Sequence, residues 1–377
     1  MYQTGSTHLT IPLSLYVHFP WCVRKCPYCD FNSHPLSGTL DEAGYLRALQ
    51  RDLEIQLEDV PANSIQSVFF GGGTPSLFSP GAFAELLDSL SDVMVPNAEV
   101  TMEANPGTTE YHNFQEYRAA GINRLSLGAQ SFSNVQLERL GRIHSAFETS
   151  ESFAKARTGG FANVNLDLMY ALPQQTVSEA IFDLTSAIAL APEHISWYQL
   201  TIEPKTEFAR RPPILASESA VEGMEKRGHA LLADAGYRRY EISAYATESH
   251  QCLHNLNYWT FGDYLGAGAG AHGKRSRPTG IVRTSKPRQP RLYLANPEAT
   301  NQLGLAECEL AGEFMMNALR LSDGVSFELF TQRTGVPFET ISEQWQTLVN
   351  QGLVCEERLA ATPLGYRHLD SLIQRFL

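Results

Sequence analysis

The sequence predicts an α/β fold in which parallel strands alternate with helices, followed by a mostly helical C-terminal domain. Two observations predict it. Short β-branched and aromatic runs alternate with amphipathic segments through the first 245 residues, and helical segments after residue 306 lead into a short hairpin. Strand, helix and strand in repeated succession form right-handed βαβ units, which build a parallel sheet.

The first part of the chain carries six expected strands and five expected helices. The strands are expected at residues 13–19, 65–70, 99–104, 124–128, 164–168 and 194–200. The helices are expected at 41–58, 79–90, 108–120, 146–158 and 176–190, several opening on Ser, Thr or Asp as an N-cap. Six strands are too few for a complete eight-stranded barrel, so a partial barrel and an open doubly wound sheet both remain possible.

The pattern changes after about residue 210. A helix at 217–234 and a strand at 240–245 precede an aromatic, glycine-rich and basic segment, with seven basic and no acidic residues from Lys274 to Arg291. Helices at 306–321, 326–334 and 338–351, a hairpin of 353–355 and 359–361, and a last helix from Pro363 then indicate a winged-helix-like module. We therefore expect a core domain at 1–245, a connecting segment at 246–300 and a winged-helix-like domain at 301–377.

Composition excludes several classes of protein. With 43% hydrophobic and 19% charged residues, the chain is neither disordered nor collagen-like nor a coiled coil. A net charge of −12 opposes nonspecific binding to nucleic acid or anionic membrane, and the acidic C-terminal module is a poor match for phosphates. The first ten residues lack a signal-peptide pattern and no window approaches about 18 apolar residues, so we expect a cytoplasmic protein without membrane insertion.

Unusual residues stand at, near or just after the ends of five successive strands. They are a cysteine loop, the run Gly71-Gly72-Gly73-Thr74-Pro75, Glu103, Gln130 and Asp167. Ligands bind at the carboxyl ends of strands in barrels and in doubly wound sheets alike, so these residues are expected to line one pocket.

The cysteine loop holds Cys22, Cys26 and Cys29, with aspartate next in sequence. Three thiolates cannot complete a four-cysteine zinc site, and they leave one iron of a cubane [4Fe-4S] cluster open. An open iron can chelate a small molecule through two atoms, as such a cluster does with S-adenosylmethionine. A zinc site with a distant fourth ligand and unliganded buried cysteines are the alternatives.

CVRKCPYC after LYVHFPW resembles the CxxxCxxC signature of the radical SAM superfamily, in which the reduced cluster cleaves S-adenosylmethionine to a 5′-deoxyadenosyl radical. Eight further segments resemble motifs of its anaerobic coproporphyrinogen oxidase subfamily. They are GGGTPS, MEANPG, LSLGAQSF, LGRIH, NLDLMYALP, SWYQLTIEP, HNLNYW and FGDYLGAGAGAHG. The resemblance covers nearly the whole chain. It implies a partial (β/α)6 TIM-like barrel with a [4Fe-4S] cluster on Cys22, Cys26 and Cys29.

The resemblance also implies contacts with S-adenosylmethionine, through backbone, amide, guanidinium and carboxylate groups and two flanking tyrosines. These residues are Tyr16, Tyr28, Gly72, Gly73, Thr74, Glu103, Gln130, Arg142 and Asp167. Some of them also have a structural interpretation: a turn for the glycine motif, a surface ion pair for Arg142 and core packing for the two tyrosines.

Two departures from the oxidase pattern favour a haem carrier over the oxidase. The oxidase continues CxxCxC where this chain reads Cys29-Asp30-Phe31, and it has a long N-terminal arm where about a dozen residues precede Leu13 here. A haem chaperone that passes haem to an acceptor haemoprotein is therefore the expected function. Oxidative decarboxylation of coproporphyrinogen III is the alternative, and radical modification of tRNA ranks below it.

A haem carrier needs an axial ligand, apolar surface and cations for the propionates. His254 in HNLNYW matches the HNxxYW motif of haem-binding family members and is the expected ligand, ahead of His272 and Cys252. A hydrogen-bonded structural histidine is the alternative interpretation of His254. The basic run from Lys274 could meet propionates or a partner, although a solvated loop is the commoner reason for such a run. The acceptor is expected to be a haemoprotein such as a membrane-associated respiratory protein, and a homodimer is one assembly open to the chain.

Overall fold

A twelve-stranded sheet forms the centre of the computed structural model, which describes residues 11–108 and 113–377. Its strand order is β14-β13-β12-β11-β1-β4-β5-β6-β7-β8-β10-β9. The strands are β1 (Leu13–Phe19), β4 (Ile65–Gly72), β5 (Met94–Ala104), β6 (Arg124–Gln130), β7 (Val164–Tyr170), β8 (His194–Gln199), β9 (Arg238–Glu241), β10 (Ala244–Ala246), β11 (Asp263–Ala267), β12 (His272–Arg277), β13 (Gly280–Ser285) and β14 (Asn301–Gly304).

The six predicted parallel strands are confirmed. Strands β1, β4, β5, β6, β7 and β8 lie side by side in chain order and all run parallel. Strand order in a doubly wound sheet reverses at a switch point, whereas in a barrel it follows the chain, so the partial barrel is the correct alternative. All seven residues of β6 are buried, as expected for a strand covered on both faces.

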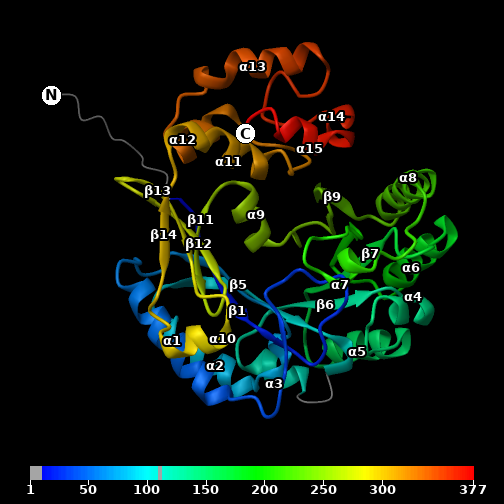
Figure 1. The fold of residues 1–377 in the computed structure, drawn as a ribbon, viewed down its shortest axis with the longest axis vertical. Coiled ribbons are helices and arrows are strands. Elements are labelled where there is room, and N and C mark those ends of the chain that lie inside the picture. The colour runs from blue at the N-terminus through cyan, green and yellow to red at the C-terminus, as the bar shows by residue number, and fades with distance from the viewer. Residues whose placement is uncertain (1–10, 109–112) are drawn as a thin grey trace.

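Helices connect and cover these strands, and Figure 1 shows several of them along one side of the sheet. They are α1 (Glu42–Leu57), α2 (Pro80–Ser89), α3 (Phe114–Ala119), α4 (Asn134–Arg139), α5 (Ala146–Thr158), α6 (Val177–Ala189), α7 (Glu207–Arg210) and α8 (Glu218–Asp234). The predicted caps form: Ser145 and Glu148 make a capping box at α5, and Thr176 and Glu179 make another at α6. The predicted helix at 108–120 lies partly outside the described residues, which hold α3.

The predicted strand at 240–245 is wrong, because residues 242–243 form a tight turn. The chain reverses there, so β9 and β10 pair antiparallel with each other, and β10 pairs antiparallel with β8. This hairpin forms one edge of the sheet. The last parallel strand of the barrel is thereby covered by an antiparallel edge.

The segment 246–300 contributes more than a connection, because three of its stretches are strands of the central sheet. Strand β11 runs parallel to β1 with Tyr16 opposite Gly266, and β12 and β13 continue the sheet as an antiparallel hairpin. The segment also holds α9 (Leu253–Trp259) and α10 (Pro290–Ala295). Part of the basic run is buried, since Lys274 pairs with Asp263 at 2.9 Å. A solvated loop therefore does not describe the whole run, and the domain boundary at 245 stays a prediction.

The C-terminal helices enclose a second core around Phe314, Phe330 and Trp345 and stand at one end of the molecule (Figure 1). They are α11 (Glu307–Ala318), α12 (Phe327–Thr334), α13 (Glu339–Asn350), α14 (Pro363–Arg367) and α15 (Leu369–Ile373). The predicted final helix is interrupted at His368. The two arms of the predicted hairpin are joined by one isolated bridge, Val354 with Ala361, and a second bridge joins Leu359 to Val325 before α12.

Within the described ranges, no helix is long and apolar enough to cross a membrane.

Candidate functional site

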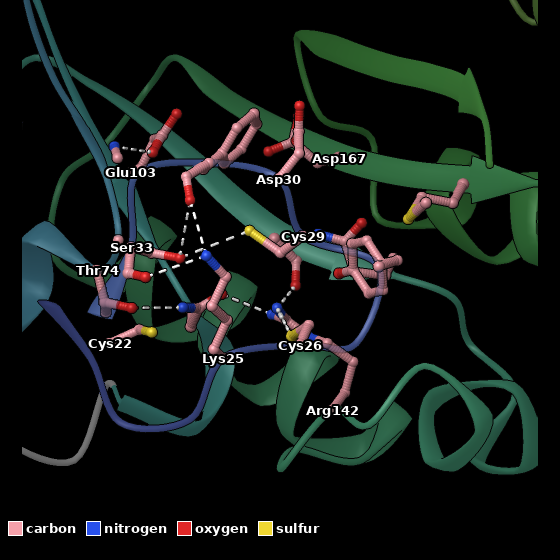
Figure 2. A pocket seen from close by; sticks show the side chains of 18 of the residues that line it. Cys22, Lys25, Cys26, Cys29, Asp30, Ser33, Thr74, Glu103, Arg142 and Asp167 are labelled. Atoms are coloured by element: carbon pink, nitrogen blue, oxygen red, sulfur yellow. Dashed lines mark hydrogen bonds between the residues drawn. The ribbon is translucent and has the colours of Figure 1, made fainter. Parts of the chain in front are cut away.

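A cavity of about 330 Å³ lies where the cysteine loop covers the carboxyl ends of the parallel strands. Figure 2 shows Lys25 among the three cysteines, with Glu103 and Asp167 across the cavity. Its lining includes the three cysteines and every predicted S-adenosylmethionine residue except Tyr16. The prediction that five strand ends share one pocket is therefore confirmed. Asp167 lies within β7 rather than at its end, because this strand continues to Tyr170.

The cysteine loop is closed at its base by a strand pair and stabilised by hydrogen bonds inside the loop. Two short strands, β2 (Trp21–Cys22) and β3 (His34–Pro35), pair where the loop begins and ends. Inside the loop the Cys29 N–H donates to the Cys26 carbonyl at 3.1 Å. The Lys25 ammonium donates to the carbonyls of Phe31 and Ser33, at 3.0 and 3.1 Å. These bonds hold the three thiols around one side of the cavity.

Three cysteine thiols in one loop are a donor set that fits a [4Fe-4S] cluster with one open iron. In the described parts of the chain no three His, Cys, Asp or Glu side chains come close enough to share one ion. A cubane takes one thiolate per iron, so its ligands need not converge on a single point. The Arg142 Nη1 donates to the Cys26 sulfur at 3.6 Å, and so links the cysteine loop to the wall of the cavity. Burial raises the pKa of Cys22 to about 11, so metal binding there would release a proton.

Two glycines at the end of β4, Gly72 within the strand and Gly73 just after it, are required by close packing. At Gly73 a Cβ would lie 2.3 Å from the Trp21 carbonyl oxygen. Gly72 has φ +117°, and a Cβ there would lie 2.4 Å from the His18 ring. The adjacent Thr74 is buried and accepts a hydrogen bond from the Asn105 amide at 2.9 Å. The motif thus lets the backbone line the cavity beside the cysteine loop.

Two of the acidic residues that line this cavity, Glu103 and Asp167, lie in different surroundings. Glu103 accepts a hydrogen bond from the Gly72 N–H at 2.9 Å, and burial, with Asp167 adding to it, raises the pKa of Glu103 to about 7. Burial also raises the pKa of Asp167. Asp167 accepts hydrogen bonds from Ser126 at 3.0 Å and Asn165 at 2.8 Å, which orient its carboxylate toward the cavity.

An amide and a guanidinium complete the wall. Gln130 has φ +66°, a strained conformation for a residue other than glycine, and its side-chain oxygen accepts from the Tyr198 hydroxyl at 2.9 Å. Arg142 donates to the Asn105 side-chain oxygen at 2.6 Å and to the Gly128 carbonyl at 2.8 Å. Tyr28 lines the cavity from the cysteine loop, and burial raises its pKa.

Sequence reasoning missed three supporting residues: Lys25, Asn105 and Tyr198. Lys25 pins the loop, Asn105 joins Arg142 to Thr74, and Tyr198 holds Gln130. Asn105 directly follows a strand end, which is the same signal that identified Glu103. The roles of Lys25 and Tyr198 depend on partners far away or on loop shape, for which the sequence carries no local signal.

A second cavity, of about 500 Å³, adjoins the first and shares Phe31, Gly72 and Glu103 with it. Its wall is largely aromatic and carries nitrogen groups at its rim. The remaining lining residues are Tyr16, His18, Asn32, Phe69, His254, Asn255, Tyr258, Tyr264, Gly270, His272 and Arg288. Tyr16, predicted to flank S-adenosylmethionine, thus lines this second cavity and not the first.

His254 lies on α9 and is 2% exposed. Its ring stacks on Phe69 with centroids 5.0 Å apart, its Nδ1 lies 3.0 Å from the Ser67 hydroxyl, and its Nε2 lies 3.2 Å from the Tyr258 hydroxyl. Burial lowers the pKa of His254 to about 3, so the imidazole is neutral at physiological pH and keeps one ring nitrogen unprotonated.

The two weaker ligand candidates differ in place. His272 is exposed at the rim of the second cavity, close to Arg288. Cys252 is fully buried outside it, with its thiol donating to Glu99 at 3.5 Å. Of these two, only His272 is placed to contact a ligand in the second cavity.

A three-cysteine loop over a parallel partial barrel defines a protein of the radical SAM class. The family model of the Radical SAM superfamily matches residues 16–184, and that of the HemN C-terminal domain matches residues 305–368. The structure of the coproporphyrinogen III oxidase HemN from Escherichia coli shares the fold, with a TM-score of 0.80 at 22% identity over 98% of this chain and 91% of that chain.

Within that class the chain belongs to the HemW family. It is 45% identical to "Heme chaperone HemW" of Escherichia coli over 97% of this chain and 98% of the relative. It is also 45% identical to the Haemophilus influenzae protein of that name, with the same coverage. A bovine relative, "Radical S-adenosyl methionine domain-containing protein 1, mitochondrial", is 35% identical over 97% of this chain and 87% of its own.

Proposed function

We propose that this protein is a haem chaperone, which binds haem in the second cavity and passes it to an acceptor haemoprotein. One observation carries the proposal: an aromatic cavity with a buried neutral histidine opens directly beside the cavity of the cysteine loop. The family membership supports the same function. The Cys29-Asp30-Phe31 sequence also favours it over the oxidase, since Phe31 stands where the oxidase pattern has a further cysteine.

In the first cavity, Cys22, Cys26 and Cys29 would hold a [4Fe-4S] cluster, and the polar groups opposite would bind S-adenosylmethionine. When bound and reduced, this pair supplies reductive cleavage of the sulfonium. The chain's own residues would bind the cluster and S-adenosylmethionine and orient them toward each other. Asp167, fixed by Ser126 and Asn165, is suited to ribose hydroxyls, and Arg142 places a cation beside Cys26.

In the second cavity, His254 would ligate the haem iron through its basic nitrogen. Tyr16, Phe69 and Tyr264 offer ring surface to the macrocycle. Arg288 and His272 stand at the rim, where a cation can meet the propionates. The Asn32 amide donates to the Arg288 carbonyl at 2.8 Å, which holds this part of the rim against the cysteine loop.

An anaerobic haem titration of the cluster-reconstituted protein tests the proposal. We expect a saturable Soret change without consumption of coproporphyrinogen, weakened by His254→Ala while iron and sulfide content stay the same. Decarboxylation of coproporphyrinogen III with S-adenosylmethionine and reductant, without haem binding, would make the protein an oxidase. Co-purifying RNA in place of haem binding would favour a tRNA-modifying enzyme.

We place this activity in the cytoplasm, because cluster thiolates require a reducing compartment. The acceptor is proposed to be a haemoprotein, and a membrane-associated respiratory protein remains our prediction for it. A homodimer is likewise a prediction, which size measurement with and without haem would test.

A further inference from the structure

We propose that Ser67, held by Ser14, is a positioning residue that fixes the tautomer of His254, so that Nδ1 carries the proton and Nε2 presents its lone pair to the second cavity. The consequence for haem rests on the proposed function. The tautomer itself does not, because it is a property of the haem-free protein.

Counting protons across three side chains gives this tautomer. The Ser67 hydroxyl donates its only proton to the Ser14 oxygen, at 2.8 Å. The contact of 3.0 Å between the Ser67 oxygen and His254 Nδ1 can then be a hydrogen bond only if Nδ1–H is the donor. A neutral imidazole has one N–H, so Nε2 is unprotonated.

The sheet holds this arrangement in place. Ser14 and Ser67 are direct neighbours in the parallel register of β1 and β4, and both side chains are at most 1% exposed. A buried pair of hydroxyl groups on two adjacent strands has few other hydrogen-bond partners within reach. The direction of the Ser67 hydroxyl is thus set by the core of the barrel and not by solvent.

The two nitrogens of His254 point to different surroundings. Ser67 and Ser14 do not line the second cavity, whereas Tyr258, the neighbour of Nε2, does. With Nε2 unprotonated, the Tyr258 hydroxyl donates to it at 3.2 Å and occupies the lone pair that iron would take. Histidine ligands in proteins usually donate their second ring N–H to a neighbouring acceptor, which is the role this assigns to Ser67.

The backbone around His254 is fixed separately. The Glu99 carboxylate on β5 accepts from the N–H groups of Leu253 and His254, both at 3.1 Å, and so caps the start of α9. Glu99 therefore sets where the ring lies, and Ser67 sets which nitrogen is basic. A change at Ser67 should alter the ring's protonation without moving the helix.

Nitrogen-15 NMR of haem-free protein labelled at histidine tests the tautomer directly, with the His254 signals assigned by their loss in His254→Ala. We expect a protonated Nδ1 and an unprotonated Nε2 in the wild type. A protonated Nε2 would overturn the inference. In Ser14→Ala the Ser67 hydroxyl becomes free to donate to Nδ1, so the signals should shift toward the Nε2–H form.

Haem titration then tests the consequence. Ser67→Ala should weaken haem binding about tenfold and change the Soret spectrum, with cluster content unaltered, and Ser67→Thr should restore both. Thr149→Val, which removes a buried hydroxyl of α5 lining neither cavity, is the control and should bind as the wild type does. If His254→Ala weakens binding and Ser67→Ala does not, the positioning role is wrong. If His254→Ala leaves binding unchanged, the proposed ligand is wrong, while the NMR result still decides the tautomer.

Discussion

Glu103 is the ionisable side chain that borders both cavities, and its position gives it an unusual protonation state. Its carboxyl is removed from bulk water and lies near a second carboxylate, Asp167, so the charged form is disfavoured at neutral pH. The Gly72 N–H partly compensates by donating to it. At the residue scale, the protonation state of a single buried group such as Glu103 sets the charge that each cavity presents to a ligand.

We expect Glu103→Gln to stabilise the ligand-free protein above neutral pH. The folded pKa of about 7 exceeds the ordinary value of 4.5, so the native state keeps a proton that the unfolded chain loses between these values. The unfolding free energy of the wild type therefore falls as pH rises through this window. Since glutamine has no such loss, the variant should gain about 3 kcal/mol at pH 8 and almost nothing at pH 4.5.

Urea denaturation at both pH values measures this effect. The glutamine oxygen can still accept from Gly72, so the comparison isolates the charge. Identical pH dependence in the wild type and the variant would show that Glu103 is ionised throughout the range.

Cys26→Ala should abolish the cluster, because one of the three thiolate ligands disappears. After anaerobic reconstitution we expect the brown chromophore to be lost, with iron and sulfide near background. Cys308→Ala is the matched control, since Cys308 is an exposed free thiol on α11, far in sequence from the loop. Unchanged iron and sulfide in Cys26→Ala would contradict the cluster assignment.

At the scale of elements, α9 is held by contacts from several strands. Its first turn is capped by Glu99 from β5, and its histidine reaches Ser67 on β4. The Cys252 N–H at its start donates to the Tyr240 hydroxyl at 3.2 Å. A short helix has little stability of its own, so these tertiary contacts fix its position.

Glu99→Ala should destabilise the protein by about 2 to 4 kcal/mol, because the buried N–H of His254 and the partly buried N–H of Leu253 lose their acceptor. We expect weaker haem binding together with a lower urea midpoint, and cluster content like that of the wild type. Glu99→Gln keeps an acceptor oxygen, so its haem binding and its urea midpoint should fall less than those of Glu99→Ala. An unaltered midpoint in the alanine variant would show that α9 is positioned by other contacts.

At the scale of the whole molecule, a buried ion pair ties the basic segment after β13 to α1. Lys286 and Asp52 lie 2.5 Å apart and are 4% and 0% exposed. Asp52 also accepts hydrogen bonds from the Tyr293 hydroxyl at 2.8 Å and the Gly268 N–H at 3.1 Å. This network fixes the glycine-rich turn and Arg288 at the edge of the second cavity.

We expect Asp52→Asn to lower the unfolding free energy by about 3 to 5 kcal/mol, because it leaves the Lys286 ammonium buried without its counter-charge. Arg51→Gln is a matched control, since Arg51 pairs with Glu298 across the same two regions but in solvent. Arg51→Gln should lower the unfolding free energy by only about 0 to 1 kcal/mol. Equal urea midpoints for the two variants would show that the buried pair contributes no more than the exposed one.

The sequence alone predicted the features encoded by neighbouring residues. Apolar runs and amphipathic periods placed the six parallel strands and most helices, because side-chain periodicity reflects local backbone geometry. Three cysteines within eight residues identified the cysteine loop, since residues close in sequence within a loop are also close in space. Motifs at the strand ends identified most of the first cavity for the same reason.

The tertiary structure alone decided what depends on distant segments. It set β11 beside β1 and turned residues 238–246 into a hairpin. It built the second cavity from residues as far apart as Tyr16, Phe69 and Arg288, and moved Tyr16 into it. It also joined Ser67 to His254 across 187 positions. No local pattern specifies such pairs, because they form only when packing of the whole sheet brings separate strands and helices together.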